Sequence, residues 1–202
     1  MITVIDYGMG NIGSVINMIR RIGGEVRSSS SLDEIKDSRK LILPGVGAFD
    51  AGMTALEESG LGEALKDAVV SNGAYILGIC LGMQLLLDSS EEGERSGLGL
   101  VPGRVTRFKV ETQGLPVPHM GWNVIKPVKP SPIVQSNDLL QRFYFVHSYH
   151  VECADLNDVA ATSEYGHEFV SVLERKKIFG VQFHPEKSHR FGMELLRKLI
   201  EL

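Results

Sequence analysis

The sequence has 202 residues, of which 43% are hydrophobic and 23% are charged, and its formal net charge is −4. This composition favours one globular domain, and its slight acidity argues against nucleic acid or an anionic membrane as a partner. No apolar run is long enough to span a bilayer, and the N-terminus lacks the basic stretch of a signal peptide. With only two cysteines, Cys80 and Cys153, we expect reduced thiols and a cytoplasmic location.

Strands and helices alternate in the first part of the chain. Short apolar runs predict strands at 2–6, 25–28, 40–43 and 75–79. Helix-period runs lie between them, at 11–22, 32–36 and 51–72, the last with a break near Ser59 and Gly60. This alternation predicts a mainly parallel sheet with helices on both faces.

The pattern changes after Gly103. Short runs at 105–108, 122–125, 142–146 and 169–173 are separated by proline, glycine and polar residues, which is typical of antiparallel strands. A further strand at 178–183 and an amphipathic helix at 188–202 end the chain. We therefore predict an α/β fold in one domain, 1–202, with a mainly parallel central sheet, flanking helices and a small antiparallel side sheet.

Residues 8–13 match the dinucleotide-binding pattern G-x-G-x-x-G between a predicted strand and a predicted helix. That pattern also requires an acidic residue at the end of the second strand, where this chain has Ser28 and Ser29. We therefore interpret these glycines, including Gly10, as a tight turn at a partner surface.

The run Gly78-Ile79-Cys80-Leu81-Gly82 has the G-x-C-x-G form of a nucleophile elbow with a thiol in place of a hydroxyl. An apolar strand precedes it and a helix-like run, 81–87, follows. Such a turn needs glycines on both sides, because side chains there would clash across it. We expect Cys80 to be a nucleophile, with a buried structural cysteine as the alternative.

A base for this thiol is expected at the end of the 178–183 strand, where the chain reads His184-Pro185-Glu186. Pro185 stops the strand, and Glu186 is close enough in sequence to hold the imidazole by a hydrogen bond. Cys80, His184 and Glu186 would then form a nucleophile, a base and an orienting group. The alternative is a surface turn.

An oxyanion hole is predicted from two backbone N–H groups. Gly47 lies in the run Pro44-Gly45-Val46-Gly47 after an apolar strand, and Leu81 follows the nucleophile. Together they could hold the negative oxygen of a tetrahedral intermediate.

The segments 78–84 and 180–186 resemble the triad-type (class I) glutamine amidotransferases. The runs 6–11, 43–49, 118–123 and 145–149 are similar to one branch of that family, the glutaminase subunits of imidazole glycerol phosphate synthases. The resemblance covers nearly the whole chain and implies the class I glutamine amidotransferase fold. It also implies hydrolysis of L-glutamine to glutamate and ammonia without a cofactor.

The resemblance carries further residue roles. It implies that Gln84, Glu92 and the backbone at Ser148 and Tyr149 bind glutamine. It also implies that Gly10, Trp122, Tyr144 and Lys187 lie toward a synthase subunit, and that the orientation of the Gly47 loop depends on activation.

The remaining histidines do not suggest a metal site, because no cysteine or carboxylate set has metal-ligand spacing. His147 and His150 would point to opposite faces if they lay in one strand.

The domain fills the chain and leaves no room for an ammonia acceptor. The resemblance implies a heterodimer with a synthase (cyclase) subunit of (βα)₈ barrel fold. That complex would make imidazole glycerol phosphate and an aminoimidazole carboxamide ribotide in histidine biosynthesis. Three alternatives stay open: a paralogous subunit that supplies a surface-sugar amidating synthase, a cysteine hydrolase or peptidase, and a binding module without activity.

Overall fold

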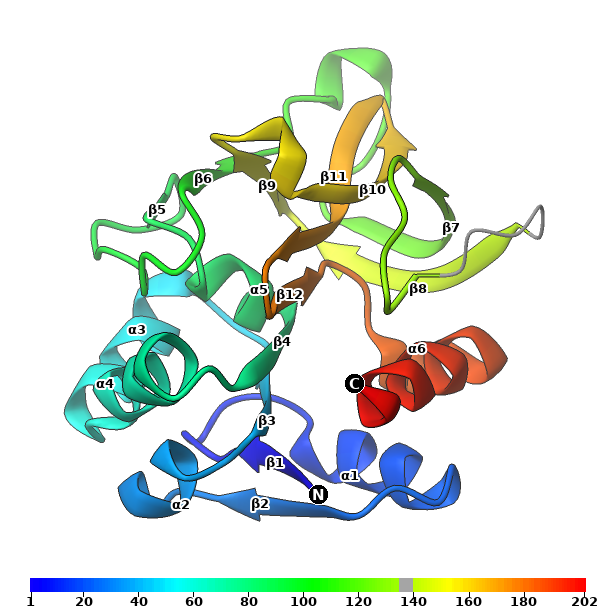
Figure 1. Cartoon of the computed structure of the whole chain (residues 1–202). Coiled ribbons are helices and arrows are strands. Elements are labelled where there is room, and N and C mark those ends of the chain that lie inside the picture. Colours follow the sequence, from blue (N-terminus) through cyan, green and yellow to red (C-terminus); the bar gives the residue numbers. More distant parts are fainter. Residues whose placement is uncertain (135–139) are drawn as a thin grey trace.

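Five parallel strands form the centre of the molecule in the computed structural model, which describes residues 1–134 and 140–202 (Figure 1). Their order is β2-β1-β3-β4-β12. The strands are β1 (Ile2–Ile5), β2 (Val26–Ser29), β3 (Lys40–Gly45), β4 (Tyr75–Cys80) and β12 (Ile178–Val181). Most of their residues are apolar and buried, as expected for a parallel sheet covered on both faces.

Helices cover both faces of this sheet. They are α1 (Ile12–Arg21), α2 (Leu32–Lys36), α3 (Phe49–Glu58), α4 (Leu61–Lys66), α5 (Leu81–Leu85) and α6 (His189–Glu201), with a π turn at Asp67–Ser71. Ile19 of α1 and Leu195 of α6 belong to the apolar core on one face. Phe49 of α3 and Leu65 of α4 belong to the core on the other. The predicted break between α3 and α4 is confirmed.

Seven further strands continue the sheet. They are β5 (Ser89–Ser90), β6 (Gly103–Arg107), β7 (His119–Pro127), β8 (Gln141–His147), β9 (Tyr149–Cys153), β10 (Val159–Tyr165) and β11 (His167–Arg175). Three short 3₁₀ turns lie at Glu111–Gln113, Leu156–Asp158 and Pro185–Lys187. The predicted antiparallel strands are present, but they are not a separate sheet. β11 pairs antiparallel with β12, which joins them to the centre in one 12-stranded sheet.

The parallel pairing of β4 with β12 places the predicted site. Gly78 pairs with Gly180 and Ile79 pairs with Val181. Residues that follow these two strands therefore meet at one sheet edge, the carboxyl edge where α/β proteins bind ligands.

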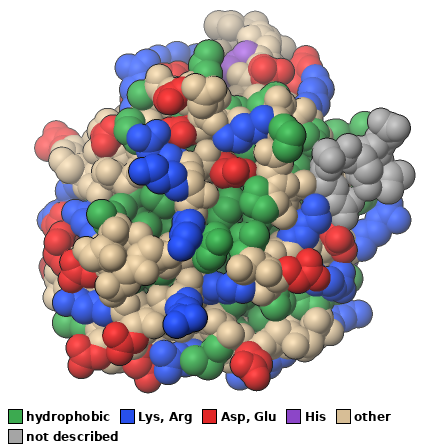
Figure 2. All heavy atoms as spheres, viewed as in Figure 1, with side chains coloured by type: hydrophobic (Ala, Val, Ile, Leu, Met, Phe, Trp, Pro, Cys, Tyr) green, Lys and Arg blue, Asp and Glu red, His purple; other side chains and the backbone are tan. Residues whose placement is uncertain are grey.

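The surface agrees with the mixed composition. On the face shown in Figure 2, acidic and basic side chains are interspersed, without a broad area of one sign. None of the helices in the described ranges has both the length and the apolar character that a membrane crossing requires.

Candidate active site

Cys80 sits on a strained strand-to-helix turn. It ends β4 and caps α5, with φ 54° and ψ −109°. A Cβ atom at Gly78 would lie 2.6 Å from the carbonyl oxygen of Gly82, and one at Gly82 would lie 1.8 Å from that of Leu43. Both glycines are therefore sterically required, and the turn has the geometry of a nucleophile elbow. A strained non-glycine residue at the end of a central strand favours a functional cysteine over a packing one.

His184 and Glu186 are both buried and lie beside this turn. His184 Nδ1 is 2.8 Å from Glu186 Oε1. Its Nε2 has no nitrogen or oxygen partner and is left to face the Cys80 thiol. Burial lowers the pKa of His184, but the hydrogen bonds with Cys80 and Glu186 outweigh this and raise it to about 9.

A cavity of about 330 Å³ opens over Cys80. Its lining residues are Val46, Gly47, Cys80, Leu81, Gln84, Glu92, Pro118, Val146, His147, Ser148, Tyr149, His184 and Lys187. The residues predicted as oxyanion donors and as glutamine contacts thus surround the nucleophile and the base. The cavity is large enough for a small polar substrate.

The predicted oxyanion loop rests against the N-terminal turn. Gly47 has φ +113°, and a Cβ atom there would lie 2.9 Å from Met9 Cε. A Cβ atom at Gly10 would lie 3.1 Å from the backbone carbon of Pro44. The hydroxyl of Tyr7, a residue that sequence reasoning missed, donates to the Pro44 carbonyl at 2.7 Å. The glycine turn therefore supports the strand that leads to Gly47.

The predicted glutamine contacts are held by protein hydrogen bonds. Glu92 Oε2 accepts the backbone N–H of Phe49 at 2.9 Å, which fixes the carboxylate at the start of α3. Gln84 Nε2 donates to the carbonyl of Tyr149 at 3.2 Å. The carbonyl of Ser148 accepts the N–H of Phe108 at 3.0 Å. Because Gln84 donates its amide protons to Tyr149 and Gln182, its side-chain oxygen is the group that remains for a ligand.

Gln182 is a site residue that sequence reasoning missed. Its side chain is fully buried, and its Nε2 lies 3.8 Å from Cys80 Sγ. Its Oε1 accepts from Gln84 Nε2 at 3.1 Å. This second bond fixes the amide so that its N–H₂ group, and not its oxygen, faces the sulfur.

A second hydrogen-bond chain reaches Tyr149 from strand β7. His147 Nδ1 lies 2.7 Å from the Tyr149 carbonyl, so it must be the donor, which leaves Nε2 as an acceptor. His119 Nδ1 therefore donates to His147 Nε2 at 3.0 Å, and Asn123 Nδ2 donates to His119 Nε2 at 3.3 Å. Burial lowers the pKa of His119 to about 4 and that of His147 to about 3, so both rings are neutral.

His147 and His150 do not lie in one strand, so the condition under which they would point to opposite faces is not met. The rings of both contact Phe108, with centroid distances of 5.2 Å and 4.7 Å. A bend at Ser148 separates β8 from β9, so the two histidines belong to different strands and the alternation rule does not relate them.

Three residues predicted to face a partner gather near the site. The Trp122 and Tyr144 rings meet edge to face at 6.1 Å, and Lys187 Nζ lies 5.8 Å from the Tyr144 ring centroid. Trp122 is 43% exposed and Met120 on the same strand is 61% exposed. The fourth, Gly10, lies apart from this aromatic cluster, beside Pro44.

Within the described part of the chain, no three histidine, cysteine or acidic side chains are arranged to hold a metal ion. Both cysteines are free. The groups that the structure brings together at the cavity over Cys80 are a thiol, an imidazole, a carboxylate and backbone N–H groups.

Comparisons with known proteins agree with this geometry. The family model described as glutamine amidotransferase class-I matches residues 3–202. The PurLQS structure from Thermotoga maritima has a TM-score of 0.77 at 18% identity, covering 99% of this chain and 97% of that one. The glutaminase domain of Trypanosoma brucei CTPS with bound acivicin has a TM-score of 0.70 at 16% identity, covering 99% and 93%. These two likenesses establish the fold.

Curated relatives define the branch. A Methanococcus maripaludis protein named imidazole glycerol phosphate synthase subunit HisH 2 is 48% identical over 100% of this chain and 99% of its own. Its Pseudomonas aeruginosa namesake is 46% identical, and the Bdellovibrio bacteriovorus subunit HisH is 45% identical, each with full coverage of both chains. The chain therefore belongs to the class-I glutamine amidotransferase family and, within it, to the HisH subunits of imidazole glycerol phosphate synthase.

Proposed function

We propose that this amidotransferase hydrolyses L-glutamine at Cys80 and passes the ammonia to a separate synthase subunit. The observation that carries the proposal is the strained Cys80 turn with the buried His184–Glu186 pair beside it. Glutamine fits the cavity with its α-ammonium toward Glu92. Its α-carboxylate then lies toward the backbone at Ser148 and Tyr149.

The reaction begins when the Cys80 thiolate attacks the carboxamide carbon. The N–H groups of Gly47 and Leu81 hold the oxygen that becomes negative. Protonated His184 gives its proton to the leaving ammonia, which breaks the C–N bond and leaves a thioester on Cys80. Neutral His184 then takes a proton from water, and the hydroxide attacks the thioester carbonyl. The C–S bond breaks, which restores the Cys80 thiolate, and the product acid loses its proton to solvent as glutamate. Glu186 holds His184 through Nδ1 and stabilises its charged form.

Gln182 has a positioning role in this mechanism. Its N–H₂ group faces the sulfur, and a hydrogen bond to an ionised acceptor is stronger than one to a neutral acceptor. It therefore places a hydrogen-bond donor at the reacting sulfur. Gln84 keeps this amide in the productive orientation.

The names of the relatives support histidine biosynthesis as the pathway. In this proposal the partner is a (βα)₈ barrel cyclase that contacts the cluster of Trp122, Tyr144 and Lys187. The complex is a cytoplasmic heterodimer. It uses ammonia to form imidazole glycerol phosphate and an aminoimidazole carboxamide ribotide.

A second candidate is a paralogous subunit that supplies a surface-sugar amidating synthase. Two of the three relatives carry the number 2 in their names, which fits organisms with more than one such subunit. The triad geometry is the same in both candidates, so the partner decides between them.

The test measures glutamine turnover in three mixtures: the chain alone, the chain with the cyclase encoded in the same genome, and both proteins with the nucleotide substrate of the cyclase. We expect slow turnover alone and strong activation in the third mixture. A tenfold activation corresponds to about 1.4 kcal/mol of preference for the active orientation of the Gly47 loop. Equal rates in all three mixtures would contradict the coupling. Activation only by a sugar-modifying synthase would select the second candidate.

A further inference from the structure

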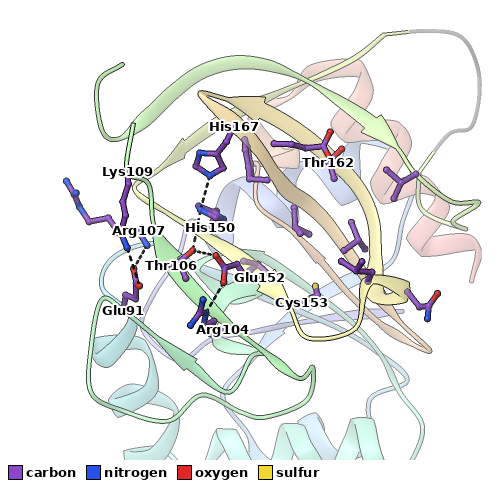
Figure 3. Close-up of a pocket in the computed structure, with 18 of the residues that line it drawn as sticks. Glu91, Arg104, Thr106, Arg107, Lys109, His150, Glu152, Cys153, Thr162 and His167 are labelled. Carbon is purple, nitrogen blue, oxygen red and sulfur yellow. Dashed lines mark hydrogen bonds and ion pairs between the residues drawn. The ribbon is translucent and has the colours of Figure 1, made fainter. Parts of the chain in front are cut away.

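A second cavity, with a volume of about 790 Å³, lies among the outer strands (Figure 3). It shares no lining residue with the cavity over Cys80. Strands β6, β9, β10 and β11 contribute most of its wall. The Leu156–Asp158 turn, the segment after β7, Glu91 after β5 and Lys109 after β6 contribute the rest. Its size is within the range of cavities that bind small organic molecules.

The cavity has an apolar surface at its base and at its rim. Phe169 and Val159 are buried at the base. Val128 and Leu156, at the rim, are 55% and 83% exposed. Apolar groups on both levels favour a flat, apolar body over a sugar, because a ring placed against them would remove the exposed Val128 and Leu156 side chains from water.

The acidic residues of the wall already have donors. Glu152 accepts from Arg104 Nε at 2.8 Å and from the Thr106 hydroxyl at 3.2 Å. Glu91 accepts the N–H of Arg107 at 2.8 Å and lies 3.8 Å from Lys109 Nζ. The third carboxylate of the wall, Glu168, is exposed at the rim.

Lys129 is the cation of the wall whose charge is not matched. Its Nζ donates to the backbone carbonyls of Asn157 and Glu174. No carboxylate of residues 1–134 and 140–202 lies within ion-pair distance of it. A ligand with one negative group would therefore find a partner at Lys129 without displacing a protein carboxylate.

Two polar atoms in the wall lack partners. His150 and Thr162 are only 6% and 7% exposed, and neither His150 Nδ1 nor Thr162 Oγ1 makes a hydrogen bond. Thr106 gives its hydroxyl proton to Glu152, and His150 Nε2 lies 3.3 Å from both Thr106 Oγ1 and His167 Nε2. A proton on His150 Nε2 serves both of these neighbours as a donor. His150 Nδ1 is then a bare acceptor. A ligand with an N–H or O–H donor that reaches this atom would satisfy it.

We propose that this cavity binds a small, planar organic acid: an aromatic or heteroaromatic ring with one anionic substituent and one N–H or O–H donor. The anion pairs with Lys129, the ring lies on Phe169 and Val159, and the donor meets His150. This site is independent of glutamine hydrolysis at Cys80.

Indole-3-acetate is a suitable probe, because it combines a flat ring, one carboxylate and one N–H. Titration of the full ¹⁵N-labelled chain, followed by amide NMR, should give saturable shifts at Val159 and Phe169 that persist with excess L-glutamine. Naphthalene-1-acetate, which lacks the N–H, and indole-3-ethanol, which lacks the charge, should each bind more weakly.

The variant Lys129→Met should raise the Kd for indole-3-acetate about tenfold, as expected for the loss of one charge-assisted hydrogen bond. Lys177→Met is the matched control, because Lys177 also donates to a backbone carbonyl, that of Gly73, and lies outside the cavity. Absence of saturable shifts, displacement by glutamine, equal binding of all three probes, or equal effects of the two substitutions would each overturn the proposal.

Discussion

The backbone N–H of His184 donates to the carbonyl of Tyr144 over 2.9 Å. The N–H of Tyr144 donates to Ser188 Oγ at 3.0 Å, and that hydroxyl donates to the carbonyl of His184 at 2.5 Å. These three bonds close a ring between the proposed base and the strand that carries the aromatic cluster. A partner that presses on the Tyr144 side chain would therefore act on the main chain of His184 without an intervening residue.

Replacing the proposed nucleophile should abolish turnover and preserve the fold. Cys80→Ser is expected to lower glutamine hydrolysis by at least about a thousandfold, because an alcohol at this turn is far less acidic than a thiol. Steady-state assays with the cyclase present measure the loss. Thermal unfolding and cyclase binding serve as controls and should match the unsubstituted chain. Activity near the original level would refute the assignment of Cys80.

The alkaline limit of activity should depend on Glu186. The pKa of His184 is raised to about 9, so its imidazolium persists at neutral pH and is lost as pH rises through 9. Glu186→Gln removes one of the interactions that raise this pKa, so the alkaline limb of kcat/KM should move to lower pH. Loss of the proton from the α-ammonium of glutamine also affects the alkaline limb. This effect is the same for both enzymes, so it does not contribute to the difference between them. An unchanged alkaline limb would contradict the role of Glu186.

Gln182→Met tests the N–H donor to the thiol. We expect kcat to fall about tenfold with little change in KM, because one hydrogen bond to a charged group is lost. The rate at which iodoacetamide alkylates Cys80 should fall. Gln113→Met, at an exposed position in a 3₁₀ turn, is the matched control. If the role of Gln182 were purely structural, the substitution would lower the stability of the chain and leave the rate of Cys80 alkylation unchanged.

The two cysteines should differ in reactivity. Burial and, after it, the neighbouring charge of Asp158 raise the pKa of Cys153 to about 12, so this thiol stays protonated. A diazo-ketone analogue of glutamine should therefore label Cys80 and spare Cys153, as peptide mass mapping can show. The analogue should inactivate the Cys153→Ser variant at the same rate as the unsubstituted chain. Predominant labelling of Cys153 would count against the elbow.

The aromatic cluster should dominate binding of the cyclase. Trp122→Ala is expected to raise the Kd of the complex at least tenfold, since exposed tryptophans at interfaces are frequent hot spots (about 2 kcal/mol or more). Val70→Ala removes another exposed apolar side chain, 71% exposed on the π turn after α4, and should have no effect. Calorimetric titration compares the two. If the two substitutions lowered the affinity for the cyclase equally, or not at all, the interface would lie elsewhere.

Local signals made much of the fold, and the positions of the three proposed triad residues, predictable. The elbow depends on glycines two residues either side of Cys80, and His184 and Glu186 are two residues apart, so each motif is visible in a short stretch. The helix expected at 32–36 has the bounds of α2, and Ser31 caps it by accepting the N–H of Glu34.

The features of the site and fold that could not be predicted from the sequence depend on contacts between distant segments. Gln182 reads as an ordinary polar residue in a strand, and only the approach of β4 and β12 brings it to Cys80. The chain from Asn123 through His119 to His147 depends on the pairing of β7 with β8. The continuity of the sheet through β11 likewise requires knowledge of strand order, which periodicity does not contain.

The position of β12 has a consequence for incomplete chains. This strand, made from residues 178–181, lies between β4 and β11, in the interior of the sheet and not at its edge. A polypeptide that stops before Ile178 would leave β4 and β11 with unpaired backbone groups facing each other across a gap. Two exposed strand edges favour association with other chains. Prematurely terminated products are therefore expected to aggregate or be degraded, and ribosome-bound chains cannot release ammonia before residues 178–186 have been made.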